Sequence, residues 1–99
     1  MESGSIVIAY LQNPKERIWG ELVKISEFGI IVRGLDVNSF EDWCRQVAKE
    51  ESGIGLTTVM YPTHRVERII LDEEVGGLPS MSDKFQELVG ITVEEFLSD

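Results

Sequence analysis

The stretch IVIAYLQNPKERIWGELVKISEFGIIVRGL, residues 6–35, contains three apolar segments separated by two short breaks. Residues 5–11 and 17–25 are rich in β-branched and aromatic side chains, and Asn13-Pro14 lies between them. Residues 26–29 (SEFG) have the composition of a turn, and residues 30–35 are apolar again. Segments of this length and composition favour strands. The stretch therefore predicts three sequential strands that form a meander, and Gly20 predicts a bulge or bend in the second.

Two further segments, TTVMY (57–61) and RVERIIL (65–71), have the same β-type composition, and Pro62-Thr63-His64 lies between them. In the second segment, strict alternation would put Arg65 and Ile69 on one face and Val66 and Ile70 on the other. Five short, bent, mostly sequential strands predict a closed or partly open small barrel, because closure removes unpaired edges.

A helical segment is predicted between the third and fourth strands, at residues 39–52. Phe40, Trp43, Cys44 and Val47 recur there with the spacing of one helix face. Ser39 has the position of an N-terminal cap, with Asp42 three residues later. Cys44 lies on the apolar face, so we expect a small buried side chain rather than a nucleophile.

The C-terminal region is acidic and helical. Residues 72–99 hold eight acidic side chains and one lysine, whereas residues 1–71 hold ten acidic and eight basic ones. Ser80 or Ser82 can begin a helix that ends at Gly90, and Thr92 with Glu95 can begin another. We predict a barrel at 1–75 and an acidic extension at 76–99 that packs on the barrel or on a neighbouring subunit. The apolar residues expected to make this contact are Phe85, Leu88, Val89, Phe96 and Leu97.

Composition limits the function. One cysteine in 99 residues excludes an internal disulfide and favours a reducing compartment, so we expect a cytoplasmic protein. The apolar run at the N-terminus is too short for a signal peptide or a membrane span, so no membrane partner is expected. One histidine, one cysteine and no glycine-rich phosphate loop predict no metal, no cofactor and no catalytic residues. The chain is therefore not expected to be an enzyme.

The first 27 residues of the quoted stretch resemble the first motif of the Sm/LSm/Hfq superfamily of small β-barrels. Gly20 and Leu22 match its G-x-L, Phe28 matches the aromatic residue before the turn, and Ile31 and Val32 match the apolar pair that follows. The resemblance implies a five-stranded Sm-like (SH3-like) barrel, mainly β, with a helical insert between strands 3 and 4 and a helical tail.

VMYPTHRVERIIL (59–71) resembles the second motif of the same superfamily. Val66 and Ile69 match its V-x-x-I, and His64 falls at the histidine of the Y-K-H turn in bacterial Hfq. The Asp and Asn of the first-motif turn in RNA-binding members correspond to Ser26 and Ile30 here. An aliphatic side chain cannot make the hydrogen bond that the Asn makes to a base.

The resemblance implies assembly through the edges of the fourth and fifth strands. We expect a homo-oligomer with Val59 and Tyr61 near the contact, acting as a non-catalytic interaction or scaffold protein that can engage a protein partner. The alternative is an RNA-binding protein that uses other residues, with no role for DNA. RNA binding is expected to be weak, because phosphate contacts require clustered basic side chains. The candidate RNA-binding residues are His64, Arg65, Arg33 and Phe28.

Overall fold

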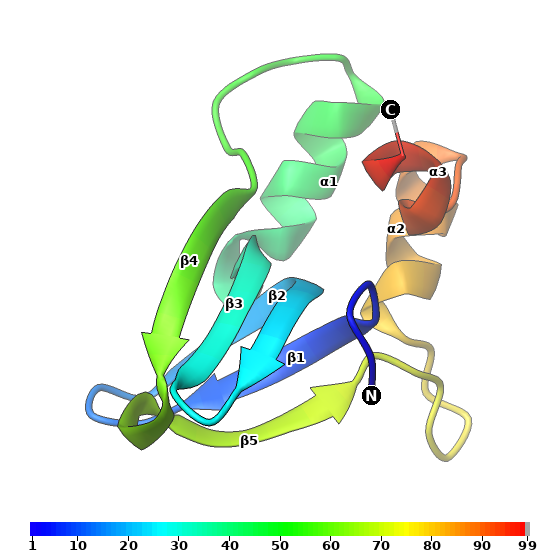
Figure 1. The fold of residues 1–99 in the computed structure, drawn as a ribbon. Coiled ribbons are helices and arrows are strands. Elements are labelled where there is room, and N and C mark those ends of the chain that lie inside the picture. Colours follow the sequence, from blue (N-terminus) through cyan, green and yellow to red (C-terminus); the bar gives the residue numbers. More distant parts are fainter. Residues whose placement is uncertain (99) are drawn as a thin grey trace.

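The computed structural model describes residues 1–98 (Figure 1). The strands are β1 (Ile6–Leu11), β2 (Glu16–Ser26), β3 (Gly29–Asp36), β4 (Thr57–Pro62) and β5 (Val66–Leu71). The α-helices are α1 (Phe40–Ala48), α2 (Met81–Val89) and α3 (Val93–Leu97), and two short 3-10 helices are η1 (Val37–Ser39) and η2 (Thr63–Arg65). The predicted order of three strands, a helix, two strands and two helices is confirmed, and the protein is mainly β with added helices.

The strands form one antiparallel sheet in the order β4-β3-β2-β1-β5. Strands β4 and β5 therefore lie at the two ends of the sheet, and within residues 1–98 they do not pair with each other. The turn η2 joins them, and Figure 1 shows the two strands diverging from that turn. The sheet is thus open between β4 and β5.

Two glycines allow β2 and β3 to approach closely. Gly20 lies opposite Gly34 in the pairing of these strands. A Cβ atom added to Gly20 would overlap the Arg33 carbonyl, and one added to Gly34 would overlap the Trp19 carbonyl. The predicted bulge is not at Gly20: the register shifts between Leu22 and Lys24 instead. Gly20 is required for space between the backbones.

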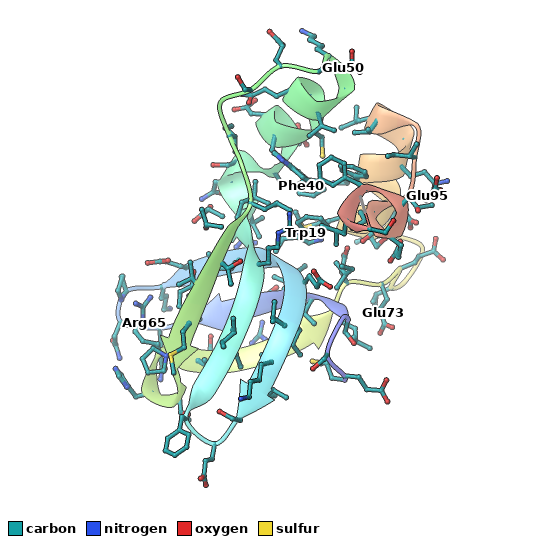
Figure 2. All side chains as sticks on the ribbon, turned by 45° about the horizontal axis from the view of Figure 1, so that its top comes forward. Trp19, Phe40, Glu50, Arg65, Glu73 and Glu95 are labelled. Atoms are coloured by element: carbon teal, nitrogen blue, oxygen red, sulfur yellow. The ribbon has the colours of Figure 1, made fainter. Side chains whose placement is uncertain are left out.

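The two faces of the sheet pack into separate apolar clusters. The inner cluster lies on the concave face of the sheet, and the outer cluster lies between the opposite face and the helices. Figure 2 shows Trp19 and Phe40 at this second contact. The buried residues of the inner cluster are Val7, Ala9, Leu11, Ile18, Leu22, Ile30 and Val32. Those of the outer cluster are Trp19, Leu35, Phe40, Trp43, Cys44, Phe85 and Val93.

Aromatic rings connect the C-terminal helices to the rest of the protein. The Trp19 ring centroid lies 4.9 Å from that of Phe40 and 5.6 Å from that of Trp43. The Trp43 centroid in turn lies 5.2 Å from Phe85 on α2 and 5.6 Å from Phe96 on α3. Such contacts add to the free energy gained by burying the rings. Helices α2 and α3 therefore pack on α1 and on the outer face of the sheet.

Asp72 fixes the start of α2 against the sheet. Its Oδ2 atom accepts hydrogen bonds from the Trp19 indole N–H at 3.0 Å and from the Ser82 backbone N–H at 2.8 Å. Its Oδ1 atom accepts one from the Met81 backbone N–H at 2.9 Å. A carboxylate at a helix N-terminus satisfies N–H groups that have no partner within the helix. One side chain therefore joins β2, the end of β5 and α2.

The helix ends follow the predictions in part. Ser80 and Asp83 form a capping box at α2, and Gly90 ends that helix with φ +97°. Thr92 accepts a hydrogen bond from the Glu95 N–H at 3.0 Å and so caps α3. Ser39 is the N-cap residue of α1 as predicted, but the predicted capping box is wrong, because the Ser39 side chain makes no capping hydrogen bond. The side chain of Asp36 instead accepts a hydrogen bond at 2.7 Å from the N–H of Asn38, in η1.

The predicted alternation along β5 is also wrong. A register shift at Tyr10/Leu11 on β1 pairs Leu11 with Val66 and Ala9 with Ile69. Val66 and Ile69 both pack against the inner cluster, on one face instead of on two. A bulge adds a residue to one strand and reverses the alternation beyond it.

Candidate interaction surfaces

The outer edge of β4 presents unpaired backbone groups. The Thr63 N–H donates to the Phe28 carbonyl at 2.9 Å, so residue 63 directs its N–H toward the β2–β3 turn. In an antiparallel pair the inward direction recurs at every second residue. Val59 and Tyr61 therefore direct their N–H and C=O groups toward β3, and Thr58 and Met60 direct theirs to the free edge.

The outer edge of β5 has the same character. The Asp72 N–H donates to the Ile6 carbonyl at 2.9 Å, so residue 72 points toward β1. By the same alternation, Ile70 also points toward β1, whereas Ile69 and Leu71 direct their N–H and C=O groups away from it. The structure thus has two free edges, each on a strand of six residues.

Apolar side chains line the opening between these edges. Ile25 and Leu71 are exposed, and Val66 and Ile69 are half-buried. A cavity of about 180 Å³ at the opening is lined by Ile25, Ile30, Val66 and Ile69, together with Ser26, Gly29 and Thr63. The open side of the sheet therefore leaves part of the inner cluster accessible.

Val59 and Tyr61, predicted at the oligomer contact, lie on β4, each next in sequence to a residue whose backbone N–H and C=O groups face the free edge. Val59 pairs with Val32 and Tyr61 with Ile30, and Tyr61 packs against the inner cluster. Sequence composition identified the strand, but the pairing register decides which of its residues face outward. The residues whose backbone groups face outward are Thr58 and Met60 on β4 and Ile69 and Leu71 on β5, which composition alone does not indicate.

Arg65 holds the β1–β2 turn. Its Nε donates to the Gln12 carbonyl at 2.8 Å, and its guanidinium donates to the Pro14 carbonyl at 3.3 Å. The same guanidinium forms an ion pair with Glu16 at 3.4 Å. This candidate for RNA binding therefore has a structural role in the chain itself.

Two other RNA-binding candidates, Phe28 and His64, lie on segments that are hydrogen-bonded to each other. The Thr63 hydroxyl donates to the Glu27 carbonyl at 2.7 Å, and the Thr63 N–H donates to the Phe28 carbonyl, so the β2–β3 turn lies against η2. Phe28 is 72% exposed, and His64 on η2 is also exposed. Arg33 pairs with Thr58 near the opposite end of β3 and does not join them.

Cys44 is fully buried in the outer cluster, and burial raises the pKa of its thiol from 9.0 to about 11, with Glu41 adding to the shift. Burial also raises the pKa of Tyr61. Within residues 1–98 no group of three or more His, Cys, Asp and Glu side chains is placed to hold a metal ion. None of the helices in the same range is long and apolar enough to cross a membrane.

We expect Cys44 to resist thiol reagents in the native protein at pH 8 and to react fully after denaturation. The Cys44 thiol has a higher pKa in the folded state than in the unfolded state. The protonated thiol therefore contributes its full stabilisation below about pH 9, and this stabilisation is lost as the pH rises toward about 11. Tyr61 acts in the same direction. Denaturant unfolding at several pH values measures the loss, and Cys44→Ala should reduce it. Rapid labelling of the native protein would contradict this account.

No family model matches the chain, and comparisons with curated proteins and with solved structures also find no match.

Proposed function

We propose that this protein is a non-catalytic, cytoplasmic scaffold of the Sm-like type that works as a homo-oligomer. In the assembly, β4 of one copy pairs with β5 of the next. The observation that carries the proposal is the pair of free edges at the two ends of one sheet, with outward backbone groups at Thr58 and Met60 on β4 and at Ile69 and Leu71 on β5.

The β4 edge is suited to strand addition, and on β5 the outward backbone groups belong to the apolar residues Ile69 and Leu71, next to the charged residues Glu67 and Arg68. β4 contains no charged residue, and charged side chains are a common means of preventing edge pairing. Pairing would satisfy the free N–H and C=O groups and would cover Leu71 and Ile25 at the opening. Because the two edges differ, the contact is heterologous and produces a ring or a filament. A repeated surface of this kind can hold several copies of a protein partner.

The edge contact can be tested at Met60, whose N–H faces outward. Met60→Pro removes this donor without removing a hydrogen bond to β3, so we expect a folded protein with the mass of one chain, 11.2 kDa. Met60→Ala is the matched control, since it shortens the same side chain and keeps the donor. Circular dichroism and light scattering measure folding and mass. If Met60→Pro is folded and has the same mass as Met60→Ala, the β4 edge is not the contact.

A second candidate function is RNA binding, favoured by two exposed side chains, Phe28 on the β2–β3 turn and His64 on η2, whose segments are joined by hydrogen bonds of Thr63. In a ring these two side chains would repeat once per copy and could stack on unpaired bases. The two arginines among the candidate residues add little to this surface, because Arg65 is paired with Glu16 and Arg33 lies opposite Thr58 on β4, and clustered cations supply most nucleic-acid affinity.

We therefore expect short A-rich or U-rich RNA to bind more weakly than micromolar at about 0.15 M salt, where the Debye length is about 8 Å. Titration of labelled oligonucleotides measures this affinity. Submicromolar binding that is lost in both Phe28→Ala and His64→Ala would establish RNA binding as the function.

A further inference from the structure

An exposed apolar hairpin follows β5. Val75 and Leu78 exchange backbone hydrogen bonds of 3.2 and 3.0 Å, and Gly76 and Gly77 between them have φ of +59° and +82°. Two central residues with positive φ define a tight hairpin turn. Val75 is 65% exposed and Leu78 is 73% exposed. Figure 1 shows this segment, residues 75–78, as a yellow loop that projects beyond the end of β5. The hairpin thus presents two large apolar side chains to solvent.

An apolar groove precedes β4. Its cavity of about 390 Å³ lies beside the connection from α1 to β4, with Trp43, Val47, Ile54, Leu56 and Phe96 as apolar lining. Arg33 is also in the lining, and within residues 1–98 its guanidinium forms no ion pair. We call this surface the α1–β4 groove. It combines an apolar wall with one available cation.

We propose that the apolar hairpin of one copy binds in the α1–β4 groove of the next copy. This inference rests on the proposed pairing of β4 with β5. Every strand pair of the sheet is antiparallel, and an intermolecular pair that continues the sheet in this way places the end of β5 beside the start of β4. The chain that leaves Leu71 must then pass the residues that precede Thr57, which are those of the groove.

Arg33 is the one side chain of the groove lining whose charge is opposite to that of the segment after β5. Glu73 and Glu74 lie between β5 and the hairpin, and both are exposed. In the paired arrangement they approach the part of the groove that contains Arg33. Glu50 and Glu51 at the rim of the groove would repel them, so contact beside Arg33 is favoured over contact near the C-terminal end of α1. Figure 2 shows Glu50 at the C-terminal end of α1.

Disulfide formation between two variants tests the contact directly. A Leu78→Cys chain is mixed with a Gly55→Cys chain under mild oxidation, because residue 55 lines the groove and has open space around its Cα atom. We expect a linked dimer of twice 11.2 kDa in the mixture and little in either variant alone. Leu88→Cys, exposed on α2, replaces Leu78→Cys in the control mixture. Equal linking in both mixtures, or no linking with Leu78→Cys, would overturn the inference.

Dilution experiments separate this inference from the proposed edge pairing. The double variant Val75→Ser/Leu78→Ser should weaken assembly about tenfold. In the monomeric Met60→Pro background the same change should leave the thermal midpoint unchanged, because both side chains are exposed.

Arg33→Glu should also weaken assembly, and adding Glu73→Lys/Glu74→Lys to it should restore assembly. A wild-type protein that never assembles overturns both proposals. A wild-type oligomer whose dissociation is unchanged by the double variant overturns only the hairpin contact.

Discussion

Trp19→Ala is expected to reduce the free energy of unfolding by about 3–5 kcal/mol. Trp19 is 1% exposed, and its ring contacts Phe40 and Trp43 between the sheet and the helices. Its removal also leaves Asp72 without the indole donor. In a domain of this size each kcal/mol lowers the melting temperature by roughly 4–8 °C. Thermal and urea unfolding should therefore show a large loss of stability.

Trp19→Phe separates the two contributions. It keeps an aromatic ring in the cluster but removes the N–H that donates to Asp72, so the expected loss is smaller, about 1–3 kcal/mol. Comparison with Asp72→Ala, which also removes the acceptor of the α2 backbone N–H groups, measures how far this carboxylate fixes the helix. If Trp19→Ala unfolds at the wild-type temperature, the outer cluster does not hold the tail on the sheet.

Gly34→Ala is expected to cost about 3 kcal/mol, at the upper end of the range for overpacking. The added methyl group would overlap the Trp19 carbonyl, and a backbone atom cannot move aside as the end of a side chain can. Thermal unfolding measures the effect.

Gly55→Ala is the matched control, because no atom lies within 4 Å of the added methyl group and its φ is not in the left-handed region. We expect this change to be neutral or slightly stabilising, since alanine restricts the unfolded chain. Equal melting temperatures for the two variants would show that β2 and β3 can separate at Gly34 without cost.

Local signals in the sequence were sufficient to predict the elements. The apolar runs at 6–35 and the helical spacing of Phe40, Trp43 and Val47 correctly predicted the order of strands and helices. Gly90 ends α2 as expected, and Ser80, one of the two predicted starts, begins it, because a left-handed C-terminal residue and an N-terminal side-chain cap depend on nearby residues alone.

Features that depend on pairing between distant strands were not predicted. The shift at Tyr10/Leu11 brings Val66 and Ile69 to one face, and nothing in residues 65–71 alone indicates it. The partners of Arg65 lie at Gln12, Pro14 and Glu16, about 50 positions away in the chain. The sequence alone therefore could not show whether Arg65 has a structural role or is an exposed arginine that could bind RNA.

The outward-facing backbone N–H and C=O groups of β4 and β5 also depend on pairing between distant strands. Composition identified both strands, but only the hydrogen bonds of Thr63 and Asp72 determine which N–H groups remain free. The apolar hairpin at residues 75–78 was not predicted from the sequence. Its two backbone hydrogen bonds and the exposure of Val75 and Leu78 become evident from the structure.

The mass of the wild-type protein in solution tests the proposed assembly most directly. Light scattering coupled to size-exclusion chromatography, over a dilution series that includes tens of micromolar, measures it without any variant. We expect a whole-number multiple of 11.2 kDa that falls toward one chain on dilution, as mass action requires. A mass of 11.2 kDa at every concentration would contradict assembly through the free edges of β4 and β5.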